Sequence, residues 1–212
     1  MSGARIADAR QRERLREAVE WRLLGLLFEP PSPAWREQVR ALIPETESSG
    51  LQAAAQAAVE EARESLFCTL FGPGGSAPAR EASCTQAVEL GSLMAELAAY
   101  YEAFGYQPAT AEPPDHIAVE LGFMGYLRLK EAYALACEDA ERAALTAEAA
   151  ERFLRQHLRV LAGPLVSALR SSGIRYLQLA GQELVRRAGV EATPARTVLP
   201  VMDDPFDCGV DG

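Results

Sequence analysis

Three titratable side chains, those of Asp115, His116 and Glu120, come directly after two prolines near the middle of the chain. Pro113 and Pro114 cannot continue a preceding helix and Asp is a favoured N-cap, so a helix is predicted to begin at Asp115. His116 precedes Glu120 by one helical turn, so the two side chains can meet. The sequence therefore predicts a cluster of titratable groups at this Pro-Pro-Asp-His corner, and this cluster is the candidate site.

Such a cluster could carry out acid–base chemistry, bind a metal ion or contact a partner. An acid–base enzyme needs a concave site and a substrate, and the sequence identifies neither. A metal site needs at least one more protein ligand; the only other histidine is His157 and no H-E-x-x-H motif is present, so we expect no metal. A structural interpretation, in which Asp115 caps the helix and His116 pairs with Glu120, also fits.

The composition limits the kind of partner. The chain has 212 residues, 49% of them hydrophobic, which is enough for a contiguous core in one large domain. A formal net charge of −9 disfavours binding to nucleic acid, whose phosphates attract clustered Lys and Arg, and favours a basic partner. No apolar segment follows a basic N-terminus and no uncharged run approaches the ~20 residues of a membrane span, so we expect a cytoplasmic protein. The widely separated cysteines predict reduced thiols rather than a zinc site or a disulfide framework: Cys68, Cys84, Cys137 and Cys208.

Helical spacing of apolar residues recurs along the chain, which predicts an all-α, single-domain helical bundle. Between Ile117 and Leu127 the only charged residue is Glu120, so the helix that starts at the corner is predicted to be central and buried. Gly122 and Gly125 within it predict the close approach of another backbone. The other predicted helices cover roughly residues 6–28, 33–43, 49–71, 84–104, 146–165 and 174–188, and the fourth of these is predicted to be capped by Ser83 with Gln86.

Two details of these helices depend on single residues. Thr146 is predicted to cap the helix that follows the central one, and Gly163-Pro164 should kink that helix or split it. We assign residues 1–188 to the helical domain. Residues 189–212 form a Pro- and Asp-containing tail, a composition typical of disordered chain ends.

A second candidate segment precedes the corner. Phe67, Leu70 and Phe71 share one helix face, a spacing that core packing also requires. The following Gly72-Pro-Gly-Gly-Ser-Ala-Pro78 stretch cannot be regular structure and is predicted to be a loop that could cover a groove. It lacks the Lys-Ser/Thr of a phosphate-binding loop, so nucleotide phosphates are not its expected ligand.

Taken together, these segments resemble the TorD/DmsD/NarJ family of chaperones for molybdenum enzymes, over roughly residues 21–188. One match is Phe67-Cys-Thr-Leu-Phe71 with its glycine-proline loop and Glu81-Ala-Ser83. The other is Pro113-Pro-Asp-His116 with Glu120-Leu-Gly-Phe-Met124. Weaker matches lie nearer the C-terminus: His157-Leu158, Pro164-Leu165 and Tyr176-Leu177.

The resemblance implies an all-helical chaperone without enzyme activity. Such proteins bind the N-terminal leader or the apo form of the catalytic subunit of a molybdopterin oxidoreductase, and hold it until the cofactor is inserted, before export or assembly. Arginines of a twin-arginine leader would meet acidic residues, and a groove would bury the apolar part of the leader. The client-peptide site would then comprise Phe67, Leu70, Phe71, Gly72, Pro114, Asp115, His116 and Glu120.

Several points stay open at this level. No cofactor is expected, and binding of a guanine nucleotide follows from the family resemblance only. The chain could be a monomer or a helix-swapped dimer. A generic helical protein-interaction module remains an alternative function, as does an acid–base enzyme that uses the residues of the corner.

Overall fold

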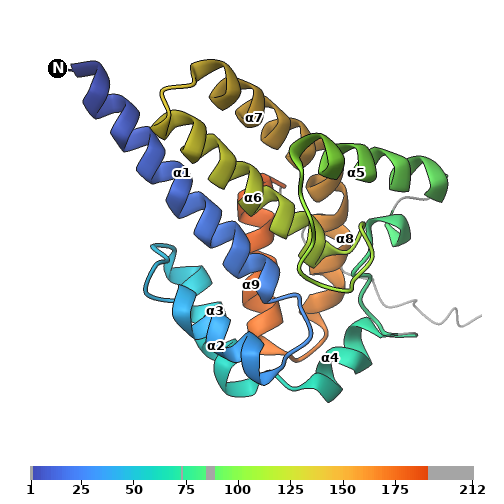
Figure 1. Cartoon of the computed structure of the whole chain (residues 1–212). Helices are drawn as coiled ribbons and strands as arrows, with labels where there is room; N and C mark the ends of the chain where they lie inside the picture. The colour runs from blue at the N-terminus through green and yellow to red at the C-terminus, as the bar shows by residue number, and fades with distance from the viewer. Residues whose placement is uncertain (1, 73, 85–88, 191–212) are drawn as a thin grey trace, which may run out of the picture.

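The chain folds into a bundle of helices, which confirms the all-α prediction (Figure 1). This computed structural model describes residues 2–72, 74–84 and 89–190. Short 3₁₀ and π segments, η1 and η2, accompany the α-helices. The elements are α1 (Ser2–Leu26), α2 (Pro33–Leu42), α3 (Ser49–Glu61), α4 (Glu64–Phe71), η1 (Glu81–Ser83), α5 (Leu90–Phe104), α6 (Ile117–Ala136), α7 (Ala140–Phe153), η2 (Leu154–Leu158), α8 (Arg159–Arg170) and α9 (Arg175–Ala188).

The core is built around α6, which runs beside the long α1 and also packs on α7 (Figure 1). Residues on every face of its first three turns are buried, as the sequence predicted. Gly125 brings α6 close to α1, because a Cβ atom there would lie 3.0 Å from the Ala18 carbonyl oxygen and 3.1 Å from the Arg22 nitrogen. Elsewhere in the bundle, α9 packs against both α3 and α8.

The helix predicted over residues 49–71 is in fact two helices. The backbone is extended at Ala62 and Arg63, so α3 ends at Glu61 and α4 begins at Glu64. The guanidinium of Arg36, on α2, donates hydrogen bonds to the carbonyl oxygens of Val59 and Ala62. This tertiary contact satisfies carbonyls that would otherwise need the next helical turn, and no Gly or Pro marks the break in the sequence.

Two further helix predictions are wrong in detail. The helix assigned to Thr146 begins earlier, at Ala140, where the Asp139 carboxylate accepts the Arg142 N–H at 3.0 Å. The helix also continues through Pro164, which lies inside α8. Its irregularity is the π turn of η2, where the Arg159 N–H donates to the Leu154 carbonyl. One extra residue in that turn changes which side chains face the core.

The C-terminal helix ends at Ala188, with Gly189 in the left-handed conformation at φ 64°. The predicted tail lies almost wholly outside the described residues, since only Gly189 and Val190 of it are described. Among the described residues, no helix has the length and apolar character needed to cross a membrane.

The contact of α6 with α1 generates a stability prediction. Gly125→Ala should lower the free energy of unfolding by about 1–3 kcal/mol, because the new methyl group meets backbone atoms that cannot move independently. Gly91→Ala, in α5, is the matched control, because a Cβ there has open space and alanine favours the helix by up to roughly 1 kcal/mol. Urea unfolding of both variants measures the difference, and equal stability of the two would contradict the close contact.

Candidate functional site

The loop after α4 returns to the corner before α6. The two segments form a short antiparallel bridge, in which the Glu81 N–H donates to the Asp115 carbonyl at 2.9 Å and the Ile117 N–H donates to the Ala79 carbonyl at 2.8 Å. These bonds tie together parts of the chain that are more than thirty residues apart. The two segments that carried the family resemblance are therefore one structural unit.

Two glycines let the loop turn sharply over the end of α4. A Cβ atom at Gly72 would collide with the Cys68 carbonyl oxygen, and one at Gly75 would collide with the Leu70 carbonyl oxygen. Both neighbours are backbone atoms, so they cannot give way as the tip of a side chain could. The glycine-rich composition of the loop thus has a packing reason.

A pocket of about 600 Å³ lies between this loop, the end of α4 and the corner. We call it the loop pocket. Its walls include Phe67, Phe71 and Gly72 from one predicted segment and His116 from the other. The remaining lining residues are Pro30, Cys68, Gly74, Gly75, Ser76, Ala77, Pro78, Ala79, Arg80, Ser83, Glu112 and Pro113.

The other four predicted site residues lie outside the lining. Leu70 is buried in the hydrophobic core. The Pro114 carbonyl accepts a hydrogen bond of 2.8 Å from the hydroxyl of Tyr101, on α5. Asp115 and Glu120 have no exposed surface. These four residues support the pocket from behind rather than forming its walls.

Asp115 does not cap the helix, so the predicted helix start is wrong by two residues. Its Oδ1 accepts a hydrogen bond from Nε of Arg80 at 2.8 Å and forms an ion pair with Nη2 at 2.8 Å, and its Oδ2 accepts the Ala82 N–H at 3.3 Å. The N-cap of α6 is His116, whose Nδ1 accepts the Ala118 N–H at 3.2 Å. The carboxylate of Asp115 instead joins the corner to the loop, a contact that local sequence cannot reveal.

The imidazole of His116 is neutral at physiological pH. Burial lowers its pKa to about 4, and the Asp115 charge opposes this shift only in part. A neutral ring with an unprotonated Nδ1 is also the form that can accept the Ala118 N–H. The nearest carboxylate, that of Glu112, lies 3.9 Å from Nε2 of the ring.

Glu120 does not pair with His116, contrary to the sequence prediction. It points into the protein, where its carboxyl group interacts with that of Glu81. Burial raises its pKa well above the usual range, and the nearby charges of Glu81 and Asp115 raise it further. Both effects favour the protonated form of this carboxyl group in the folded protein.

The residues that complete this network were left out of the predicted site, although Glu81 and His157 both lie in segments that matched the family. Glu81 Oε2 lies 3.0 Å from Nδ1 of His157, and both side chains are buried. His157 sits in the π turn of η2, against the rings of Tyr100 and Phe153. One available signal was that Arg80 and Glu81 are the first charged residues after the uncharged loop, but nothing in the sequence names their partners.

The match to a known family covers most of this site. The family described as nitrate reductase delta subunit matches residues 32–167, which include the loop, the corner and His157. The chain belongs to this family. It is a NarJ/TorD-type family of molybdoenzyme maturation chaperones, as the resemblance implied, and it acts with nitrate reductase-type molybdoenzyme subunits. A search of curated proteins found no match.

Family membership and the geometry also bear on acid–base catalysis and on metal binding, the two other roles considered for the corner. The family is one of chaperones. Asp115 and Glu120 have no exposed surface, so the structure gives these two carboxyl groups no access to a substrate. Within the described ranges, no three side chains of the His, Cys, Asp or Glu types are arranged to hold a metal ion.

The pairing of Arg80 with Asp115 predicts an asymmetry between the two partners. Arg80→Ala leaves an uncompensated buried carboxylate and should cost about 3–5 kcal/mol of unfolding free energy. Asp115→Asn keeps an accepting oxygen, and the 42% exposed Arg80 side chain can reach water, so roughly 1–3 kcal/mol is expected. The double variant should be more stable than Arg80→Ala alone. Denaturant unfolding of the three variants tests this order, and equal losses from the two single changes would contradict it.

The raised pKa of Glu120 predicts a pH-dependent gain of stability in Glu120→Gln. Above about pH 4.5 the unfolded chain loses this proton while the folded protein keeps it, so folding becomes less favourable as pH rises. Glutamine has no proton to lose. Above about pH 4.5, and as long as folded Glu120 keeps its proton, the free energy of unfolding of the variant should therefore rise relative to wild type by about 1.4 kcal/mol per pH unit. Urea unfolding between pH 5 and 8 measures the difference.

His116→Asn is the control for this measurement, because its effect has the opposite sign. Between about pH 6.5 and pH 4 the unfolded wild type gains a proton on His116 that the folded protein does not bind, so wild-type stability falls as pH falls. Asparagine keeps a capping oxygen without this titration. Parallel stability curves for wild type and Glu120→Gln would show that Glu120 is ionised in the folded protein.

Proposed function

We propose that this protein binds the N-terminal leader or the apo form of the catalytic subunit of a molybdopterin oxidoreductase through the loop pocket. It holds this client in the cytoplasm until the cofactor is inserted, before export or assembly. The observation that supports the proposal is the pocket itself, which combines both family segments in one concave surface beside a glycine-rich loop.

The size and walls of the loop pocket suit an apolar peptide segment. A volume of about 600 Å³ accommodates a few side chains of an extended peptide. The ring centroids of Phe67 and Phe71 lie 4.8 Å apart. The ring of Phe28, just after α1, packs edge-on against Phe71 with 6.3 Å between the centroids. Phe67 is buried and Phe71 is half-buried, so the parts of these rings that line the pocket are apolar and already ordered, and they lose little conformational entropy when a ligand binds.

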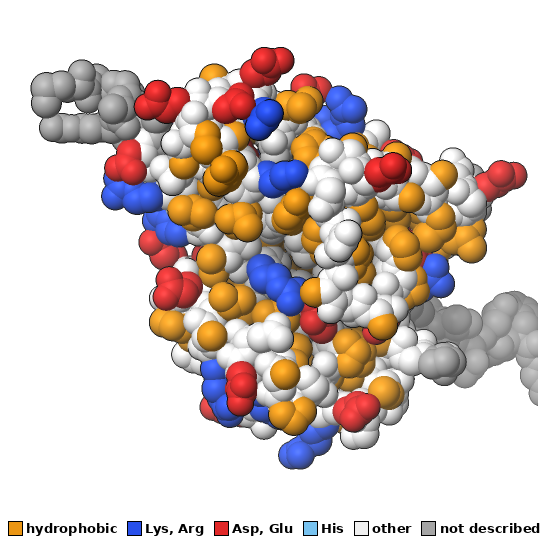
Figure 2. Space-filling model, in the orientation of Figure 1, with side chains coloured by type: hydrophobic (Ala, Val, Ile, Leu, Met, Phe, Trp, Pro, Cys, Tyr) orange, Lys and Arg blue, Asp and Glu red, His pale blue; other side chains and the backbone are white. Residues whose placement is uncertain are grey.

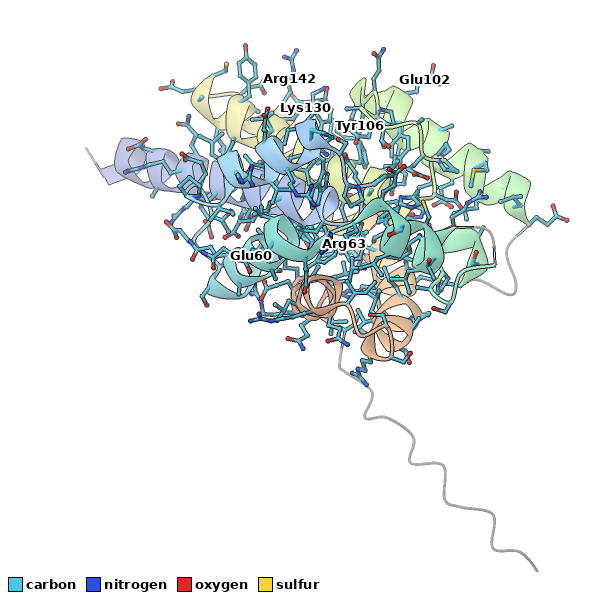
Figure 3. The ribbon with its side chains drawn as sticks, turned by 90° about the horizontal axis from the view of Figure 1, so that it is seen from below. Glu60, Arg63, Glu102, Tyr106, Lys130 and Arg142 are labelled. Atoms are coloured by element: carbon cyan, nitrogen blue, oxygen red, sulfur yellow. The ribbon has the colours of Figure 1, made fainter. Side chains whose placement is uncertain are left out.

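A different surface supports the alternative of a more general interaction module. A hollow of about 380 Å³ lies between α1, α6 and the segment that contains Tyr106, which is labelled in Figure 3. Figure 2 shows hydrophobic side chains gathered across the middle of this face. Leu15 and Leu129 are both exposed at the hollow. A partner that docked here would leave the loop pocket free.

Two exposed cysteines provide matched variants to test the loop pocket. Cys68 lines it, whereas Cys137 lies at the far end of α6. Cells that make the tagged wild type should yield a complex with the catalytic subunit of a molybdopterin oxidoreductase that contains little molybdenum. Cys68→Trp fills the pocket and should reduce the recovered subunit at least about tenfold, whereas Cys137→Trp should not. Mass spectrometry and elemental analysis of the complexes measure both quantities.

Two results would count against the proposal. Recovery of a fully loaded oxidoreductase, or of none, would remove the maturation role. If the oxidoreductase subunit is recovered with Cys68→Trp but not with Leu129→Asp, the client binds at the hollow between α1 and α6 instead. Circular dichroism and thermal unfolding of each variant show whether a loss of binding reflects a loss of fold.

A further inference from the structure

A further hollow, of about 420 Å³, lies where the ends of α5 and α6 meet the start of α7. We call it the α6–α7 hollow. Tyr133 and Leu145 line it, and at 71% and 61% exposure they are the most exposed of the large hydrophobic side chains that the structure describes. Exposed apolar side chains gathered around a hollow mark a surface that another chain segment can cover.

Lys130 gives this hollow a positive charge. It is the only lysine in the sequence, and both Lys130 and Arg142 are labelled in Figure 3. The ammonium of Lys130 donates a hydrogen bond to the Phe104 carbonyl oxygen and lies 5.2 Å from the centre of the Tyr126 ring. These contacts hold the ammonium in place without neutralising it, and none of the ion pairs among the described residues includes it. Arg142, at the rim, is 79% exposed and is already paired with Asp139 at 3.3 Å.

The two hollows described earlier offer no comparable cation. In the loop pocket the guanidinium of Arg80 is bound to Asp115, and in the hollow between α1 and α6 the guanidinium of Arg22 lies 2.7 Å from the Glu29 carboxylate. The α6–α7 hollow thus combines an exposed apolar surface with an uncompensated ammonium. The ligand that complements it has carboxylates beside apolar side chains.

The chain itself contains such a segment near its C-terminus. In Met202-Asp-Asp-Pro-Phe206, two adjacent carboxylates stand between two large apolar side chains. The segment belongs to residues 191–212, which lie outside the described residues. Its composition matches the α6–α7 hollow in both charge and apolar character.

The connecting chain is long enough for this segment to reach the hollow. The end of α9 lies beside the start of α8, because Nε of Arg159 donates to the Ala188 carbonyl oxygen at 2.7 Å. Helical turns continue from α7 through η2 into α8, so Arg142 lies roughly 25 Å from Arg159 at a rise of about 1.5 Å per residue. The thirteen residues from Val190 to Asp203 span up to about 43 Å when extended.

We propose that residues 202–206 bind in the α6–α7 hollow of their own chain. The two carboxylates of the segment pair with Lys130, and its two apolar side chains cover Tyr133 and Leu145. The C-terminal segment is then an intramolecular ligand of the helical domain. It leaves the loop pocket free, so this proposal does not depend on the proposed function.

The single lysine makes a zero-length cross-link a specific test on the full chain. A carbodiimide joins an amine to a carboxylate that is in contact with it, and Lys130 carries the only side-chain amine of the sequence. Trypsin should then release residues 129–142 joined to residues 197–212 through Asp203 or Asp204. Tandem mass spectrometry identifies the linked carboxylate and measures the yield.

Matched variants show whether the link reflects binding. Tyr133→Ser removes an apolar wall but keeps every linking group, so it should lower the yield at least about fivefold. Leu90→Ser, 53% exposed at the start of α5 and outside the hollow, should leave the yield unchanged. Phe206→Ser should lower the yield as Tyr133→Ser does, whereas Val210→Ser should not. Phe206 lies outside the helical domain, so this loss cannot come from a loss of fold.

Three results would overturn the proposal. The first is the absence of a link between Lys130 and the C-terminal segment. The second is a link whose yield is the same in wild type, Tyr133→Ser and Phe206→Ser, because chance encounters do not depend on apolar contacts. The third comes from cross-linking an equal mixture of ordinary and nitrogen-15-labelled protein. If linked peptides of mixed isotope prevail, the segment belongs to a second copy of the chain.

Discussion

The ion pair between Asp115 and Arg80 is the contact on which the rest of the site depends. Burying a carboxylate costs free energy unless its charge is compensated, and here the Arg80 guanidinium, through one hydrogen bond and one ion-pair contact, and one backbone N–H compensate it. The pair fixes the loop against the corner, together with the two bonds of the backbone bridge. Because Asp115 is occupied in this way, the cap of α6 falls to His116. The pocket is the space that this arrangement leaves between loop and helix.

Beneath that pair, buried polar side chains connect three parts of the chain that are distant in sequence. Glu81 follows the loop, Glu120 lies on α6, and His157 lies in the π turn between α7 and α8. The extra residue of that turn therefore lies beside the contact between His157 and Glu81. Pro164 of α8 lies inside a continuous helix. Most of the segments that mark the family therefore converge on one network, which ties the loop after α4 to the core of the bundle.

Much of the fold followed from the sequence because it depends on local patterns. The run from Ile117 to Leu127, in which Glu120 is the only charged residue, predicted a buried central helix. Its glycines predicted the close approach of another backbone, which is confirmed at Gly125, where α1 lies close, but not at Gly122, where a Cβ atom would meet the hydroxyl of Tyr106. The break at Ala62 was not predictable, because the guanidinium that completes it comes from α2. The early start of α7 rests on Asp139, a more favourable helix cap than Thr146. Local preference therefore favoured the observed start over the predicted one.

For the site, the sequence by itself determined the family, the two segments involved and the residue types at the pocket, including Phe67, Phe71 and His116. It could not assign Asp115, because a carboxylate after two prolines suits a helix cap as well as an ion pair. Only the tertiary structure decided that Asp115 and Glu120 lie behind the wall while Glu112 lies in it. The physical reason is that burial, partner and protonation state are properties of the assembled network, in which Arg80, Glu81 and His157 come from outside the local segment.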